Sequence, residues 1–298
     1  DRKEGKPGNN IQLTIDTELQ SYIQARLGSE SASAVVMNCK NGEILAIASS
    51  PSYDPNKFVK GISYSDFNEL RDNEFRPLAS KTVQDAYPPG STFKIVTALS
   101  ALEANIIGPK DSFTCSGKME ISNRFFHCWK NGGHGKMDLI QSLSESCDVY
   151  FYELALKVGI ERINKMATKL GLGVKHDVPM SAITKGLMPS REWKQNNREQ
   201  EWLVGDTVNA AIGQGYVLSS PLQLAVMAAR LASGKKVNPI LTKSINGQNI
   251  HNLTDIEDLD IDKSYLKIIR KALFEASNDR RGTAYSSRII DDAYRMAG

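Results

Sequence analysis

Y-P-P-G-S-T-F-K-I-V-T-A-L-S-A-L-E, residues Tyr87–Glu103, is the stretch that decides the fold. The Pro-Pro-Gly run at 88–90 cannot continue a helix, whereas the apolar residues after it have the close spacing of a helix buried on most sides. This pattern predicts a helix that begins near Ser91 and carries Lys94 one turn further along, on the same face. It places a nucleophile beside a base, and the free N–H groups of a helix start could stabilise an oxyanion.

The Ser-x-x-Lys pattern alone is weakly specific, because the chain contains Ser91–Lys94, Ser233–Lys236 and Ser264–Lys267. The second runs through a Ser-Gly-Lys-Lys turn and the third lies in a polar-faced helix, and both settings are typical of solvent-exposed positions. Only the first stands between a helix breaker and an apolar helix. On this motif alone, a catalytic serine and a helix-capping serine are equally good interpretations.

The composition is that of a soluble globular protein. A hydrophobic content of 41% and a charged content of 24% fit this class, and 298 residues can form one large domain or two small ones. The net charge of +3 comes without a basic cluster, so we expect no nucleic-acid partner. No apolar run is long enough to span a membrane. The chain begins without an initiator Met or a signal peptide, so we expect it to be cut from a longer protein.

The order of the predicted elements indicates an α+β domain with a helical insertion. Residues 1–10 are polar and contain Gly and Pro, as in a linker that enters a domain. Strands are predicted at Ile11–Ile15, Ala32–Asn38 and Glu43–Ser49, the last two forming a hairpin through an Asn-Gly turn that we expect at the centre of a sheet. Helices are predicted at Thr17–Leu27, Asp138–Gly159, Ile160–Leu170, Leu222–Ala232 and Lys263–Ser277. Loops are expected at 108–135 and 171–205, and Ile212–Tyr216 reads as a turn of closely approaching backbone.

Several stretches resemble the motifs of the penicillin-binding proteins. Residues 88–94 are similar to the first motif, and Ser146-Cys147-Asp148 is similar to the second in its Ser-x-Asp form. Supporting stretches match at 48–56, 191–194, 211–216 and 220–223. Together they resemble the class B, elongation-specific penicillin-binding protein 2 over residues 11–298. The resemblance implies the penicillin-binding-protein/β-lactamase-like transpeptidase fold, an antiparallel sheet flanked by helices with an all-helical subdomain.

One family motif is absent. The third motif, Lys-Ser/Thr-Gly, does not occur in the chain, and Arg281-Gly-Thr-Ala284 matches the loop that precedes it in relatives. The family continues with Lys-Thr-Gly where this sequence ends, so we expect a transpeptidase domain at 11–298 that is cut before the third motif and lacks its C-terminal strands. Without those strands the sheet would have an exposed edge beside the active site. We therefore expect this chain alone to be a poor or inactive enzyme.

The resemblance implies a serine acyl-enzyme mechanism. Ser91 would attack the penultimate D-alanine carbonyl of a peptidoglycan stem peptide, release terminal D-alanine and pass the acyl group to an amine of a neighbouring stem. Lys94 would act as the base, since burial favours a neutral amine, and Ser146 would relay a proton to the leaving amine. Asp148 would position the substrate backbone, or simply cap a helix. β-Lactams would acylate Ser91.

Two other functions stay open at this point. One is a serine hydrolase, either a carboxypeptidase or a β-lactamase, although the chain shows no deacylating carboxylate motif. The other is a non-catalytic β-lactam sensor. The resemblance also implies partners in the cell-elongation machinery, including a membrane-embedded glycosyltransferase. It implies a bacterial inner-membrane location with this domain in the periplasm.

A metal site is predicted between the two catalytic motifs. Cys115, Cys128, His134 and Cys147 follow the spacing C-x12-C-x5-H-x12-C, and three thiolates with an imidazole are a common tetrahedral zinc set. Members of the resembled family hold zinc here with an Asp/Asp/His/Cys set, in which His134 and Cys147 match and the other two cysteines replace the aspartates. Since neighbouring side chains in a turn point to opposite sides, Cys147 could bind metal while Ser146 and Asp148 face the cleft.

Three alternatives to this zinc set remain. Cys115 and Cys128 could form a disulfide in a domain outside the cytoplasm. The cysteines could also be unpaired core residues, as we expect for Cys39. His127 could replace His134 as the imidazole ligand. We expect one structural zinc per chain and no organic cofactor.

Overall fold

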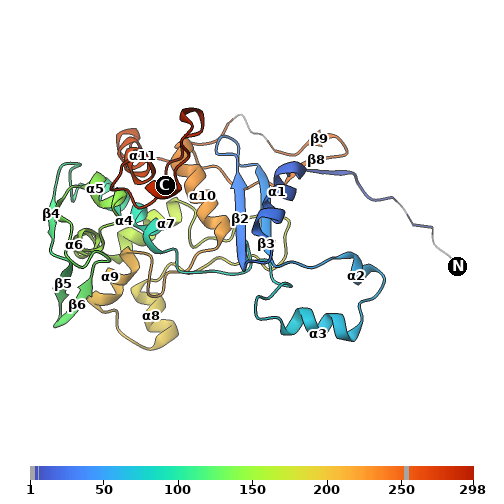
Figure 1. Cartoon of the computed structure of the whole chain (residues 1–298), viewed down its shortest axis with the longest axis horizontal. Coiled ribbons are helices and arrows are strands. Elements are labelled where there is room, and N and C mark those ends of the chain that lie inside the picture. Colours follow the sequence, from blue (N-terminus) through green and yellow to red (C-terminus); the bar gives the residue numbers. More distant parts are fainter. Residues whose placement is uncertain (1–3, 6, 252–254) are drawn as a thin grey trace. The chain divides into compact units, whose positions relative to one another are not determined.

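The apolar stretch after the Pro-Pro-Gly run forms a helix, as its spacing predicts. In the computed structural model a 3₁₀ turn, η1 (Gly90–Phe93), leads directly into α4 (Lys94–Glu103) (Figure 1). Every side chain of α4 from Lys94 to Leu102 is buried. Ser91 therefore lies on an exposed turn at the start of a buried helix, and Lys94 opens that helix. The structure describes residues 4, 5, 7–251 and 255–298.

The chain divides into two compact units, each built from three segments. We call them the sheet unit (Asp1–Ala86, Lys175–Lys185 and Ser220–Glu257) and the helical unit (Tyr87–Val174, Gly186–Ser219 and Asp258–Gly298). The helices of the sheet unit are α1 (Thr17–Leu27), α2 (Asn56–Val59), α3 (Tyr64–Asp72) and α10 (Pro221–Ser233). Its strands are β1 (Ile11–Leu13), β2 (Ala32–Met37), β3 (Ile44–Ser50), β8 (Thr242–Ile245) and β9 (Gln248–Asn249).

The predicted hairpin organises the sheet unit. β2 and β3 pair antiparallel, and every second residue of β3 is buried, which is the alternation of a strand with one face on the core. Helix α1 packs against β3 and α10 against β2. The hydrophobic core of this unit contains the buried residues Ile44, Val83, Val178 and Leu222. The predicted Thr17–Leu27 helix is confirmed to the residue, with Asp16 as its N-cap and Gly28 as its C-cap.

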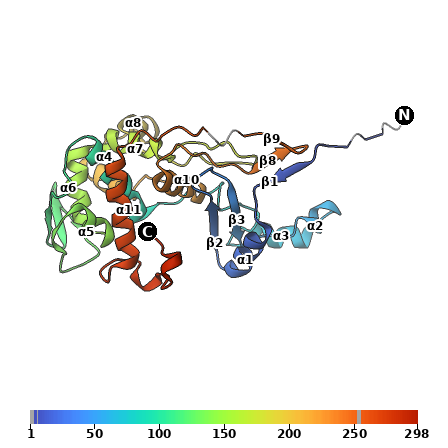
Figure 2. The same cartoon turned by 90° about the horizontal axis from the view of Figure 1, so that it is seen from above.

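The expectation that this hairpin lies at the centre of a wider sheet is wrong for the described residues. β2 and β3 form a two-stranded sheet, whereas β1, β8 and β9 form a separate antiparallel sheet (Figure 2). Between them, Glu43 and Ile240 make an isolated bridge, and Asp16 N, shortly after β1, donates to Leu45 O at 2.9 Å. Among the described residues, no continuous ladder joins β3 to β8.

The helical unit is centred on α4. This helix contacts α5, α6, α7, α9 and α11, and α11 also lies along α5 (Figure 2). The remaining helices are α5 (Leu139–Ser144), α6 (Asp148–Val158), α7 (Ile160–Lys169), α8 (Arg191–Arg198), α9 (Val204–Ala211) and α11 (Lys263–Asn278). Two further 3₁₀ turns are η2 (Tyr285–Ser287) and η3 (Asp292–Tyr294). The mixed fold with a helical subdomain is confirmed.

The helical unit also contains strands that the sequence did not predict. They are β4 (Phe113–Cys115), β5 (Lys118–Ile121), β6 (Arg124–His127) and β7 (Gly135–Met137). β4 pairs with β7 and β5 with β6, both antiparallel. The segment 108–135, expected as a loop, is therefore two small sheets, and the subdomain is not purely helical.

The predicted helix Asp138–Gly159 is interrupted at the second motif. α5 starts with the predicted Asp138 capping box and ends at Ser144, and α6 starts at Asp148 and ends before Gly159. Between them Ser146 has φ +54°, a left-handed conformation that a serine rarely adopts. The uniform helical spacing of this segment gave no sign of the break.

The linker predicted at residues 1–10 falls partly on residues 1–3 and 6, which lie outside the described residues. Residues 4, 5 and 7–10 contain neither helix nor strand, as expected. Among the described residues, none of the helices combines the length and the apolar character that crossing a membrane requires.

Candidate active site and thiolate cluster

The nucleophile predicted from the first motif is linked to the second motif by a hydrogen bond. Ser91 Oγ accepts a hydrogen bond of 2.8 Å from Ser146 Oγ, although the two residues are 55 positions apart. Ser146 lies between α5 and α6 and has a left-handed backbone. The structure therefore brings the two predicted serines into contact.

Lys94 lies behind this pair and is 1% exposed. Its ammonium group donates to Ser146 Oγ at 2.9 Å, to the Ser146 carbonyl at 2.9 Å and to Asp148 Oδ1 at 2.6 Å. An ammonium has three N–H groups, and these three acceptors match them. Lys94 thus connects to Ser91 through the Ser146 hydroxyl, which is the relay position expected for Ser146.

Asp148 occupies the first residue of α6, so its alternative interpretation as a helix cap is wrong. The N-cap of α6 is Cys147, which makes no side-chain capping bond. The Asp148 carboxylate instead bonds Lys94 through Oδ1 and the backbone N–H of Trp129 through Oδ2, at 2.6 and 2.9 Å. Its expected contact with the substrate backbone stays a prediction.

The turn that carries Ser91 is held by main-chain atoms of another segment. Gly90 N donates to Gly213 O at 3.0 Å, in the turn where the sequence predicted a close backbone approach. Gly213 has φ +70°, and a Cβ built on it would lie 2.3 Å from Gly90 O. No residue other than glycine fits here without moving the nucleophile turn. The sequence predicted a close approach but not its partner.

The supporting stretch 191–194 is the start of helix α8, which the sequence analysis assigned to a loop. Lys194 is 2% exposed and its Nζ lies 2.7 Å from Asp206 of α9. Tyr216 packs against Trp193, with ring centroids 5.2 Å apart. This ion pair and ring contact hold α8 against α9 and the 212–216 turn.

The other two Ser-x-x-Lys pairs are surface features, as expected. Ser233 Oγ donates to the Ala229 carbonyl, and Lys236 pairs with Glu257. Ser264 Oγ donates to Asp262. Both serines therefore bond to nearby groups of their own helices, which are ordinary local contacts.

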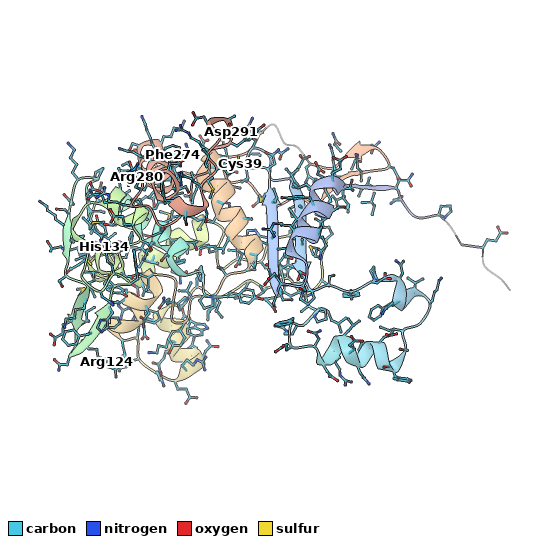
Figure 3. All side chains as sticks on the ribbon, in the orientation of Figure 1. Cys39, Arg124, His134, Phe274, Arg280 and Asp291 are labelled. Carbon is cyan, nitrogen blue, oxygen red and sulfur yellow. The ribbon has the colours of Figure 1, made fainter. Side chains whose placement is uncertain are left out.

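The four predicted metal ligands converge on one point of the helical unit. Cys115 ends β4, Cys128 follows β6, His134 precedes β7 and Cys147 caps α6, and their ligand atoms all lie within 4.8 Å of one another. The three cysteines are buried. His134, labelled in Figure 3, lies among the short strands beside α6. We call this group the thiolate cluster.

The thiolate cluster is electrostatically unusual. Cys147 donates its thiol proton toward Cys128, which lowers the pKa of Cys128 to about 5, and this bond together with burial raises the pKa of Cys147. His134 Nδ1 lies 3.6 Å from Cys115 Sγ and 3.5 Å from Cys128 Sγ. Its Nε2 is buried and has no hydrogen-bond partner among the described residues.

The structure bears on the alternatives to this ligand set. Cys115 and Cys128 are free, so the alternative disulfide is not formed. Cys39 is also free, as expected, but it is half-buried in the β2–β3 turn and is not a core residue (Figure 3). His127 is exposed on β6 and lies outside the thiolate cluster, so it is not the imidazole of this group.

Comparison with known proteins identifies the family of the chain. The family model described as the penicillin binding protein transpeptidase domain matches residues 32–298. The chain belongs to this family of penicillin-binding-protein transpeptidase domains. It is 36% identical over 286 residues to the peptidoglycan D,D-transpeptidase MrdA of Salmonella typhimurium, covering 93% of this chain and 46% of that protein. The chain thus spans about half the length of the curated relatives it matches.

Solved structures show the same fold. Pseudomonas aeruginosa PBP2 in complex with WCK 5153 is similar with a TM-score of 0.88 and 36% identity, over 94% of this chain and 64% of that one. Helicobacter pylori PBP2 in its complex with MreC gives a TM-score of 0.87 at 33% identity, over 95% and 52% of the two chains. The transpeptidase fold expected from the motifs is confirmed.

Proposed function

We propose that this chain is the acyl-transfer domain of a peptidoglycan D,D-transpeptidase that works through Ser91. The observation that carries the proposal is the continuous hydrogen-bonded path Lys94–Ser146–Ser91, which joins a buried amine to an exposed hydroxyl. A serine hydroxyl needs such a path because it is a poor nucleophile at its ordinary pKa. The family membership and the relatives named as D,D-transpeptidases support the same reaction.

The path serves both halves of acylation. The attack requires Lys94 to be deprotonated, unlike the ammonium described above, and the Ser146–Ser91 hydrogen bond to reverse. Ser91 Oγ then bonds to the penultimate D-alanine carbonyl carbon while its proton passes to Ser146, whose own proton passes to the Lys94 amine. In the collapse, the bond to terminal D-alanine breaks and its nitrogen receives a proton along the reverse direction, from Lys94 through Ser146. Asp148 stabilises the Lys94 ammonium between the two steps. An amine of a second stem then takes the acyl group and restores Ser91.

The proposal is tested by labelled penicillin, which mimics the D-alanyl-D-alanine end. We expect the complete protein to form a long-lived adduct that mass spectrometry locates on Ser91, and the Ser91→Ala variant to form none. An adduct on Ser233 or Ser264 would contradict the assignment. An adduct that is rapidly hydrolysed would indicate a β-lactamase, and the absence of crosslinks with stem-peptide donor and acceptor would indicate a sensor.

We propose further that the thiolate cluster holds one structural zinc ion. The fit rests on distances: with Zn–S near 2.3 Å and Zn–N near 2.1 Å, tetrahedral angles place nitrogen and sulfur about 3.6 Å apart. His134 Nδ1 lies 3.6 and 3.5 Å from two of the sulfurs. When bound, zinc would supply positive charge that stabilises the thiolates. Cys147 would then be fixed between Ser146 and Asp148.

Elemental analysis should find about one zinc per complete chain. Replacing Cys147 with serine is expected to remove the metal and to lower thermal stability and Ser91 acylation together, because Cys147 lies between the relay serine and its supporting carboxylate. The Cys39→Ser variant should leave all three measurements unchanged, since Cys39 lies in the sheet unit outside the thiolate cluster. A metal-free protein with full acylation would contradict this proposal.

We also propose a location and partners for the complete protein. The Helicobacter pylori relative forms a complex with MreC, which supports an assembly of this kind here. In this assembly a membrane-embedded glycosyltransferase would supply the glycan strands that the transpeptidase crosslinks. The domain would face the periplasm from the inner membrane. Co-purification of the complete protein with a glycosyltransferase from bacterial membranes tests this.

A further inference from the structure

Trp129 connects the thiolate cluster to the second catalytic motif. It directly follows Cys128, and its ring meets the His134 ring edge-on with centroids 5.4 Å apart. Trp129 also bonds the second motif: its backbone N–H donates to Asp148 Oδ2 at 2.9 Å and its indole Nε1 donates to the Ser146 carbonyl at 3.0 Å. The same indole N–H also contacts the Glu145 carbonyl at 3.1 Å. One residue therefore touches both groups.

The acceptors of Trp129 are also acceptors of Lys94. The Ser146 carbonyl receives both the indole N–H and the Lys94 ammonium, at 3.0 and 2.9 Å. The Asp148 carboxylate receives the Trp129 backbone N–H on one oxygen and Lys94 on the other. Of the three groups that hold the Lys94 amine, two are thus fixed in space by Trp129. The third is the Ser146 hydroxyl itself.

The Ser146 peptide needs such support because it lies in the break between α5 and α6. The helical hydrogen-bond ladder is interrupted between α5 and α6, and Ser146 has the left-handed φ of +54°. The indole N–H bonds two successive carbonyls within this interruption. A small rotation of the Ser146 peptide would move both its carbonyl and its hydroxyl, and with them the proton path to Ser91.

We propose that Trp129 is a positioning residue for the proton path between Lys94 and Ser91. Its indole N–H sets the orientation of the Ser146 peptide, and its place between Cys128 and the second motif ties that orientation to the thiolate cluster. This inference rests on the proposed acyl transfer. The residue Trp129 is 59% exposed, so it adds little to the core and can be changed without unfolding the unit.

The Trp129→Phe variant tests the inference, because it keeps an aromatic ring and the backbone N–H but removes the indole donor. Acylation of the complete protein by labelled penicillin is followed over a range of concentrations, which separates the limiting rate from the half-saturating concentration. We expect the limiting rate to fall roughly twofold to tenfold, the range that a single neutral hydrogen bond supports. The half-saturating concentration, melting temperature and zinc content should stay unchanged.

Trp202→Phe is the matched control. Its indole Nε1 donates to Thr207 Oγ1 at 2.7 Å in the same unit, and neither residue bonds the catalytic motifs. It should acylate like the unmodified protein.

Each other outcome overturns the inference. A raised half-saturating concentration at an unchanged limiting rate would show that the indole contacts the acyl donor. Loss of zinc from Trp129→Phe would show that it supports the thiolate cluster alone. Unchanged kinetics would show that it has no role. If the unmodified protein is not acylated at Ser91 at all, the proposed function itself fails.

Discussion

Replacing Lys94 with methionine is expected to slow acylation of Ser91 by roughly 10²–10⁴-fold, the usual contribution of a positioned general base. The side chain is 1% exposed and bonds the relay serine directly, so solvent offers no ready substitute for the amine. Methionine fills a similar volume, which limits the cavity left behind. The measurement is the limiting rate of labelled-penicillin acylation in the complete protein.

Stability must be separated from chemistry in this experiment. Lys94 pairs with Asp148, whose side chain is only 13% exposed, and removing one partner of such a pair costs about 3–5 kcal/mol of unfolding free energy. The double variant Lys94→Met/Asp148→Asn removes both charges, so it should recover stability while acylation stays slow. Recovery of acylation in the double variant would exclude Lys94 as the base.

A second lysine of the same unit provides the control. Lys169 of α7 pairs with Glu103 at 3.0 Å and also donates to the Asp260 carbonyl. The Lys169→Met variant should lose some stability in the same way. Its acylation rate should equal that of the unmodified protein, because these contacts lie at the far end of α4 from Ser91.

Gly213→Ala is expected to reduce acylation by roughly 100-fold, because a displacement of about 1 Å at a reacting group has this effect. The new Cβ would lie 2.3 Å from Gly90 O and 2.7 Å from Phe93 Cβ, so the Ser91 turn must move. The strained φ of +70° adds to the cost. Acylation rate and melting temperature are measured together.

Gly215→Ala is the matched control for this change. Its φ of +67° imposes the same backbone strain, but its Cβ would meet only Asn209 Cβ, at 3.3 Å. It should therefore lose stability like Gly213→Ala while keeping most of its acylation rate. Equal loss of acylation in both variants would show that general strain, and not contact with Gly90, governs the nucleophile turn.

Helices with local end signals could be predicted from the sequence. α1 has its caps at Asp16 and Gly28, and α10 starts with Pro221 after a Ser220 capping box. These signals act within one turn of the chain, so no tertiary information is needed. α8 was missed because it has little apolar periodicity. Its only buried side chain is Lys194, which depends on Asp206 of the next helix.

The break at Ser146 could not be predicted, because its causes are remote. Its carbonyl and hydroxyl both bond Lys94, 52 positions earlier, and these bonds compensate for the left-handed backbone. The strands β4 to β7 have only three or four residues each and face solvent for much of their length. Segments this short show no alternation that a periodicity argument can detect.

Some residues of the candidate site could be predicted from the sequence and others could not. Ser91, Lys94 and the four members of the thiolate cluster are recognisable by side-chain type and spacing, and Ser146 by its resemblance to the second family motif. The structure brings each set together. Trp129 and Gly213 were missed as site residues. They act through N–H and C=O groups and through the absence of a Cβ, which leave no pattern in residue types.

Because the path from Lys94 to Ser91 is assembled only by folding, covalent labelling of Ser91 would measure the fraction of correctly folded molecules. The members of this path come from segments 55 positions apart, and the main chain at Gly213 must also be in place for the turn to hold its shape. Under the proposed mechanism, a molecule in which any of these segments is misplaced would retain Ser91 but could not activate it. Under the proposed function, the fraction of complete proteins that take up a fluorescent penicillin would therefore count native helical units during refolding or storage, where absorbance and helix content would still register collapsed chains.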